Sequence, residues 1–214
     1  MNWLRIPLSA GLTALAATLL FIPGSQAAGP ASLAITVKQA NGLPVKDAVV
    51  MVYPKTGVPA GPIRFGWKSE MAQSNITFTP GTLIVPAGAA VRFPNYDKVR
   101  HSIYSFSKAA KVDIQLYGRD ETRSHTFAVV GSVALGCKIH DKMRGYIKVV
   151  DTPFAAKTDH NGQVKIPQLP GGEAKVKVWH PALRTRTGEH LDAVTLVPGV
   201  AATRAVTVEL RPLQ

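Results

Sequence analysis

The chain has one cysteine, few acidic residues and, after its N-terminal stretch, no long apolar run. These shortages limit the classes of protein to which it can belong. Cys137 is the one cysteine among 214 residues, so no disulfide can form within the chain. After the N-terminal stretch, no further apolar run approaches the ~20 residues that span a bilayer. Acidic residues number 13 against 25 Lys and Arg, giving a formal net charge of +12. A disulfide scaffold is therefore excluded, and no membrane span is expected after the N-terminal stretch.

Residues 1–27 have the three parts of a secretory signal peptide. Arg5 precedes an apolar stretch from about Leu8 to Ile22, and small residues ending in Ala27 follow a Pro-Gly break. We expect cleavage after Ala27 and export as a soluble protein to the periplasm, without stable membrane insertion. The alternative is an uncleaved membrane anchor, for which the apolar stretch is short.

The surplus of basic residues indicates an acidic partner. Export makes nucleic acid the least expected of such partners. The basic residues are also dispersed, without the dense runs or interleaved aromatic side chains of single-strand binders. We therefore expect no nucleic-acid binding.

Short segments rich in β-branched and aromatic residues, separated by Gly, Pro and Asn-Gly, follow one another from Leu33 onward. No segment of ten or more residues combines helical periodicity with capping residues. The pattern predicts an all-β protein with about twelve strands in two sandwich-like units. The predicted strands are 33–37, 48–53, 76–80, 82–86, 90–93, 101–107, 111–117, 124–129, 145–150, 162–166, 173–179 and 204–210.

Four potential metal ligands fall at strand ends. Cys137, His140 and Met143 lie in a short loop between two strands, and His101 begins a strand 36 residues before the cysteine. Soft sulfur and borderline nitrogen suit both Cu(I) and Cu(II). A His2Cys set with a long axial Met needs little movement when the oxidation state changes, which favours fast electron transfer. The set therefore predicts a blue copper site.

Other interpretations of these residues stay open. A single cysteine is often a small buried hydrophobe and a methionine often fills a core. Zinc is the alternative metal, although it would favour a further Cys, His or carboxylate over Met143. No nucleophile motif, second histidine cluster or carboxylate pair is found, so we expect no catalytic residues and no enzyme activity. The remaining histidines are predicted to be structural or on the surface: His125, His160, His180 and His190.

Two stretches, FTPGTLIVPAGAAVRFPNYDKVRH (78–101) and LGCKIHDKMRGYIKVVDTPF (135–154), resemble the cupredoxins of the plastocyanin and amicyanin group. The resemblance covers about residues 61–153. It is nearest to periplasmic cupredoxin-like proteins of bacteria that are labelled methylamine utilisation proteins. It implies a Greek-key β-sandwich with one type 1 copper site, in which the equatorial ligands are His101, Cys137 and His140 and the axial ligand is Met143. Ser102 departs from the pattern, because several relatives have there an Asn that helps hold the cysteine loop.

The remaining sequence resembles the two halves of a carboxypeptidase-regulatory-like, transthyretin-like β-sandwich, residues 33–54 and 156–183. Asn-Gly pairs at 41–42 and 161–162 supply the positive φ that tight hairpins need. We therefore expect the cupredoxin to be inserted into this second sandwich. The alternative is an N-terminal strand followed by an independent C-terminal domain. The predicted domains are a signal peptide (1–27), the first part of the second sandwich (29–58), the cupredoxin domain (61–153) and the second part of the second sandwich (154–214).

The resemblance implies periplasmic electron transfer by a cycling copper ion. In cupredoxins the histidine of the short loop, here His140, lies near the surface and serves as the electron port. Cations flank the ligands, so we expect an acidic redox partner such as a c-type cytochrome or a dehydrogenase. The alternatives are a solvated basic rim without a docking role, a copper-handling or assembly protein whose copper is cargo, and a structural module with a vestigial site. The flanking cations are Lys98, Arg100, Lys138, Lys142 and Arg144.

Overall fold

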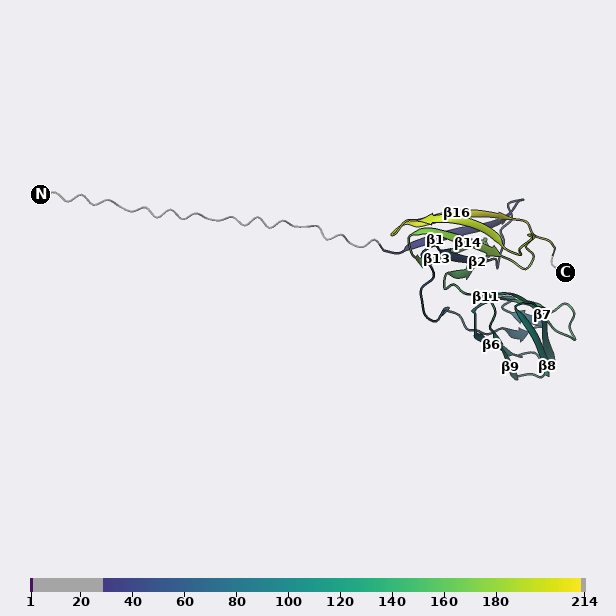
Figure 1. The fold of residues 1–214 in the computed structure, drawn as a ribbon. Helices are drawn as coiled ribbons and strands as arrows, with labels where there is room; N and C mark the ends of the chain where they lie inside the picture. The colour runs from purple at the N-terminus through teal and green to yellow at the C-terminus, as the bar shows by residue number, and fades with distance from the viewer. Residues whose placement is uncertain (2–28, 213–214) are drawn as a thin grey trace.

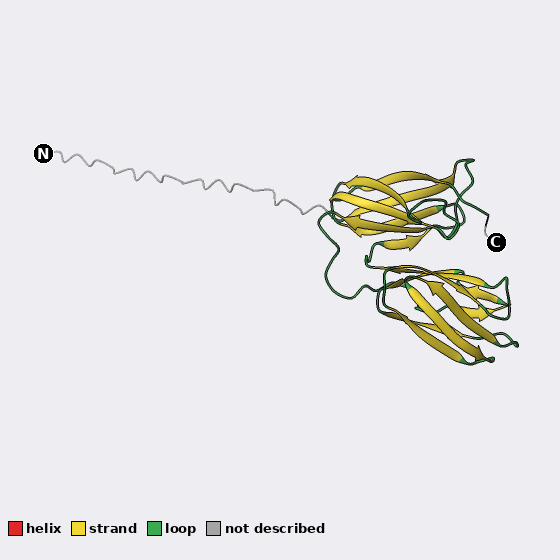
Figure 2. Cartoon of the chain, turned by 45° about the vertical axis from the view of Figure 1, so that its right-hand side comes forward, coloured by secondary structure: helices red, strands yellow, loops and turns green. Residues whose placement is uncertain are grey.

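The computed structural model describes Met1 and residues 29–212, and these residues form strands and turns without any helix. The all-β prediction is thereby confirmed. The predicted signal peptide, residues 1–27, lies outside the described residues apart from Met1. In the described part of the chain, no helix is long and apolar enough to cross a membrane. The strands gather into two bodies, which lie one above the other in Figures 1 and 2.

The first body, which we call the flanking sandwich, is built from both ends of the described chain. One sheet has the order β13-β1-β16 and the other the order β12-β2-β14-β15. β1 pairs antiparallel with β13 and parallel with β16, so it is the central strand of its sheet. Alternate residues of β1 are buried, as expected for a strand with one face on a core. The strands are β1 (Ala31–Gln39), β2 (Val49–Pro54), β12 (Ala155–Lys157), β13 (Gln163–Leu169), β14 (Gly172–Trp179), β15 (His190–Leu196) and β16 (Ala201–Val208).

The second body, the central sandwich, contains the strands between β2 and β12. A sheet of order β5-β11-β10-β7-β8 faces the pairs β3-β4 and β6-β9. Its core includes Phe78, Phe93 and Phe127 from one side and aliphatic residues of the larger sheet from the other. The strands are β3 (Ala72–Ser74), β4 (Thr77–Thr79), β5 (Thr82–Pro86), β6 (Ala89–Pro94), β7 (His101–Ser107), β8 (Ala110–Tyr117), β9 (Thr122–Phe127), β10 (Gly131–Gly136) and β11 (Arg144–Val150).

The two sandwiches pack on each other through a third apolar cluster. Ile84 and Val150 of the central sandwich meet Met51 and Trp179 of the flanking sandwich. Lys148, with a side chain only 4% exposed, pairs across this interface with Glu189 at 2.7 Å. The contact is therefore a packed interface that joins the sandwiches.

The described residues form 16 strands, where the sequence pattern predicts about twelve. β3 and β12 have three residues each, which is too short for a period of two to be recognised. β15 does alternate between exposed and half-buried positions, and the prediction missed it. The predicted segment 204–210 is displaced from β16 by two to three residues at its ends.

Candidate metal centre

Three adjacent strand ends bring the predicted ligands to one end of the central sandwich. His101 is the first residue of β7, and Cys137 follows directly after β10. β10 and β7 are neighbours in the sheet, with Gly136 opposite Tyr104, so the cysteine lies near the start of β7. His140 lies in the loop that leads from β10 to β11. The sheet order thus joins residues that are far apart in the sequence.

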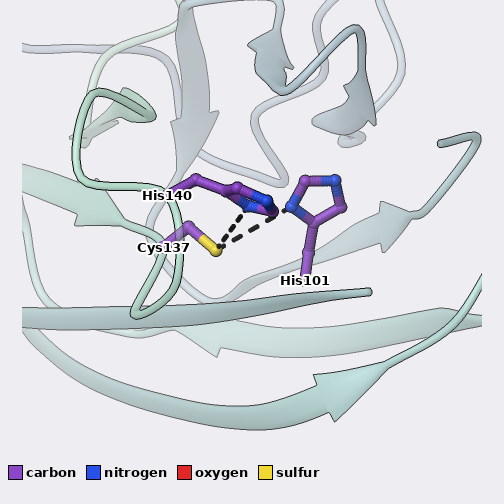
Figure 3. A group of neighbouring side chains, drawn as sticks. All are labelled: His101, Cys137 and His140. Carbon is purple, nitrogen blue, oxygen red and sulfur yellow. Dashed lines mark hydrogen bonds between the residues drawn. The ribbon is translucent and has the colours of Figure 1, made fainter. Parts of the chain in front are cut away.

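The thiol and the two imidazoles point toward one another, as Figure 3 shows. The Sγ of Cys137 lies 3.8 Å from Nδ1 of His101 and 3.5 Å from Nδ1 of His140. One donor atom from each residue lies within 4.8 Å of the others. His101 and Cys137 are buried, whereas His140 is half-buried at the surface end of the cluster. The structure therefore brings together three of the four predicted ligands as a compact donor set.

Met143, the fourth predicted ligand, ends the loop just before β11. Its side chain is buried, and it belongs to the same apolar cluster as Cys137. The amide of Met143 donates to the carbonyl of His140 at 2.8 Å, which closes a turn within the loop. The structure thus places Met143 in the apolar core that also contains Cys137, and its role as an axial ligand stays a prediction.

Two glycines fix the ends of the ligand loop. A Cβ at Gly136 would lie 2.7 Å from the ring of Tyr104, and a Cβ at Gly145 would lie 2.9 Å from Phe78. Real Cβ atoms do not approach other atoms so closely, so both positions need glycine. The aromatic rings pack directly on the backbone at the two ends, which restricts the loop between them.

Ser102 holds the cysteine loop, although it replaces the Asn that several cupredoxins have. The amide of Lys138 donates to Ser102 Oγ at 3.1 Å. The same hydroxyl lies 3.9 Å from Cys137 Sγ. The shorter side chain therefore still reaches the loop, and it sits beside the sulfur as well.

Asp97 contacts His101, and this pairing was not predicted from the sequence. Nε2 of His101 lies 2.8 Å from Oδ2 of Asp97. Burial acts to raise the pKa of Asp97, but hydrogen bonds from the amide of Ile76, from His101 and from the amide of Asn75 outweigh it and hold the pKa below its usual range. An ionised carboxylate can only accept, so Nε2 of His101 donates in this hydrogen bond. The signal in the sequence was an acidic residue in the segment that leads to a candidate ligand.

The donor set fits copper. Two atoms bound to one ion at the bond lengths usual for zinc, and about 110–120° apart, would be separated by about 3.6–3.8 Å, close to the observed 3.5 and 3.8 Å, so the spacing fits one bound metal ion. One thiol and two imidazoles, with no carboxylate among them, form a soft to borderline set that suits copper. The residues that could hold the ion are His101, Cys137 and His140, with Met143 as the predicted axial ligand.

The other four histidines lie outside this cluster in the described residues. His125 packs against Phe127 with ring centroids 4.9 Å apart. Burial lowers the pKa of His180 despite the opposing charge of Asp47, and its Nδ1 accepts from the amide of Ala182. His160 is exposed in a turn and His190 begins β15. None of the four belongs to the donor set.

No family model and no curated protein sequence matches the chain. Solved structures overlap it in part. A purple cupredoxin from Nitrosopumilus maritimus is 20% identical, with a TM-score of 0.36, over 39% of this chain and all of the other. A reduced variant of amicyanin is 19% identical, with a TM-score of 0.36, over 49% of this chain and 99% of the other. A copper-containing nitrite reductase from Thermus scotoductus is 24% identical, with a TM-score of 0.38, over 42% of this chain and 25% of the other.

Proposed function

We propose that the protein is a periplasmic type 1 copper protein that transfers electrons and has no enzyme activity of its own. The observation that carries the proposal is the convergence of the Cys137 thiol with the Nδ1 atoms of His101 and His140. Copper bound there would supply reversible one-electron chemistry between Cu(I) and Cu(II). The surrounding residues would fix the ligands and form the surface that a redox partner contacts.

The burial of the cluster supports electron transfer. His101 and Cys137 are nearly inaccessible to water, and their neighbours Asp97 and Ser102 hold them with hydrogen bonds. Ligands that are fixed before the ion changes its charge need little rearrangement. A thiol excluded from water is also shielded from oxidation in an oxidising compartment. Such a site suits a carrier better than a copper-delivery protein, whose ligands must exchange.

The surface beside His140 supports docking of an acidic partner. Tyr96 and Ile139, 55% and 50% exposed, are large apolar side chains in the loops that lead to the ligands. Lys142 and Arg144 are exposed in and beside the same loop. Lys138 is different, because its Nζ pairs with Asp113 at 2.5 Å. An acidic redox protein, such as a c-type cytochrome or a dehydrogenase, would match this rim, and His140 would be the electron port.

The flanking sandwich would have a supporting role in this proposal. It contributes no residue to the donor set among the described residues. It covers one face of the larger central sheet through the cluster that includes Trp179 and Val150. We infer that residues 61–153 are a cupredoxin domain inserted into this second sandwich, which would be carboxypeptidase-regulatory-like.

Addition of Cu(II) to the purified metal-free protein tests the function. We expect one copper per chain, an intense visible charge-transfer band from the Cys137 thiolate, and reversible bleaching by ascorbate. Cys137→Ser should abolish the band, while Met143→Leu should keep a coloured site. A Cys137→Ser protein that remains coloured, or a wild-type protein that takes up zinc and refuses copper, would contradict the proposal.

A further inference from the structure

Both carboxylate oxygens and the backbone amide of Asp97 make hydrogen bonds, although the residue lies in a loop. Its side chain is 12% exposed. Oδ1 accepts from the amide of Asn75 at 2.6 Å, and Oδ2 accepts from the amide of Ile76 at 2.9 Å. The amide of Asp97 donates to Oδ1 of Asn95 at 2.9 Å. The carboxylate therefore has one fixed orientation, and in that orientation Oδ2 also accepts from Nε2 of His101.

The turn that donates to Asp97 has an unfavourable backbone. Asn75 has φ of 55° and Ile76 has φ of 54°. The left-handed region is uncommon for residues other than glycine and is a clear outlier for a β-branched residue such as isoleucine. Both amides of this β3–β4 turn point to the same carboxylate. Strain of this kind persists where the surrounding structure over-determines it, and it is concentrated at functional sites.

The carboxylate acts on His101 in two ways. Accepting from Nε2–H keeps a proton on that nitrogen and fixes the ring, with Nδ1 lying 3.8 Å from Cys137 Sγ. It also places a negative charge beside the donor set in a largely buried position, where charges interact more strongly than in water. The thiolate alone would leave a bound Cu(II) site with a net positive charge and a Cu(I) site neutral. A second negative charge therefore favours Cu(II).

We propose that Asp97 is a positioning residue of the metal centre, which orients His101 for metal binding and favours the higher oxidation state of the bound ion. The oxidation-state part rests on the proposed copper function. Nε2–carboxylate pairs of this kind orient metal-bound histidines and raise their basicity, and removing them costs about 10–100-fold in metal affinity. The β3–β4 turn contributes to this role, because its two amides fix the orientation of the Asp97 carboxylate.

The first arm of the test needs no metal. In 15N-labelled metal-free wild type, the imidazole 15N shifts of His101 should show a proton held on Nε2. The variant Asp97→Asn keeps the shape of the side chain but not its charge, and its His101 should show a mixture of tautomers. A wild-type His101 that carries its proton on Nδ1 would overturn the proposal.

The second arm measures Cu(II) and Cu(I) affinities by competition with chelators. Asp97→Asn should lose about 10–100-fold in Cu(II) affinity and less in Cu(I) affinity. Each tenfold loss of Cu(II) preference raises the one-electron potential by about 59 mV. The control is Asp120→Asn, since Asp120 is exposed and pairs with Arg119 at 3.5 Å. It also has φ of 62°, which Asn tolerates. This control should match wild type.

The outcomes separate the two proposals. Equal losses of affinity in both oxidation states would overturn the oxidation-state preference, and no loss in either would overturn the positioning role of Asp97, while the copper function stands. A wild-type protein that binds no copper would overturn the proposed function and the oxidation-state preference with it. The tautomer measurement would still decide whether Asp97 orients His101.

Discussion

The two sandwiches are both built from short strands, yet they bury different chemistry. The core of the flanking sandwich is almost wholly aliphatic, and its buried Thr158 bonds only to the backbone of Val45 and Ala48. The central sandwich buries His101 and Cys137 at one end, with their side-chain donors aimed at each other. Buried polar groups are costly unless they are paired. The comparison shows that the flanking core is packed almost entirely from apolar side chains, whereas the central core also buries polar groups, among them those at the place where a metal would bind.

The largest effect should come from separating the two sandwiches. The flanking core needs residues of β1 and β2 as well as β13, β14 and β16. A fragment of residues 155–214 lacks the first two strands and should be unfolded by circular dichroism and NMR. A fragment of residues 61–153 keeps the whole central core and the donor set, so it should fold and bind copper.

One outcome of the fragment experiment would contradict the insertion of the central sandwich into the flanking one. If 155–214 unfolds cooperatively with dispersed NMR signals, the flanking strands do not depend on the N-terminal ones and the insertion interpretation fails. The 61–153 fragment should be less stable than the same region in the full chain, because it exposes Ile84 and Val150. Copper uptake by the 61–153 fragment reports on whether the fragment is folded.

Truncating one buried isoleucine in each core should sharpen the comparison. Ile35 lies in the flanking core and Ile147 in the central core, and both are fully buried. Either change to Ala should lower the free energy of unfolding by about 2–5 kcal/mol. Denaturant unfolding measures the loss, and the copper spectrum distinguishes the two variants. We expect Ile35→Ala to leave the spectrum of the folded protein unchanged, and a shifted spectrum would show that the two cores are coupled.

The strand content and the ligand loop could be predicted from the sequence because both depend on local patterns of residues. Alternation of apolar residues marks β1, and the Cys-x2-His-x2-Met spacing marks the loop from Cys137 to Met143. Asp97 escaped prediction because its role depends on amides of a turn 21 and 22 residues earlier in the chain. Contacts of that kind are set by tertiary packing, which a local pattern does not record. The pairing of Lys148 with Glu189 is 41 residues apart and escaped for the same reason.

That interface pair provides a smaller effect with a defined pH dependence. Burial acts to raise the pKa of Glu189, but hydrogen bonds and charges from Lys148 and Lys177 outweigh it and lower the pKa below the ordinary 4.5. The ionised form thus contributes stability above the ordinary value, and this is lost as the pH falls through the lowered pKa. Glu189→Gln should cost about 1–3 kcal/mol at neutral pH, because it leaves Lys148 without its partner.

Denaturant unfolding of wild type and Glu189→Gln across acidic and neutral pH measures this. The gap between the two proteins should be full near neutrality and shrink toward zero at low pH, where the wild-type carboxyl is also neutral. The matched control is Glu173→Gln, whose exposed carboxylate pairs with Lys55 at the surface. Exposed pairs contribute about 0–1 kcal/mol. A gap for Glu189→Gln that is independent of pH would mean that the ion pair does not stabilise the interface.

The smallest effect concerns the rim of the proposed electron port, and it appears only in rates. Lys142 and Arg144 are the exposed cations nearest His140 in the chain, whereas Lys138 is paired with Asp113. Replacing Lys142 and Arg144 with Gln should slow the reaction of the copper(I) protein with hexacyanoferrate(III), an anionic oxidant, several-fold at low salt. The Debye length shrinks from about 30 Å at 0.01 M to about 3 Å at 1 M ionic strength, so the two proteins should react alike at high salt. Replacing Lys165 and Lys175 of the flanking sandwich changes the net charge equally and should have little effect. Equal slowing by both pairs would mean that net charge, not the rim at His140, steers the approach.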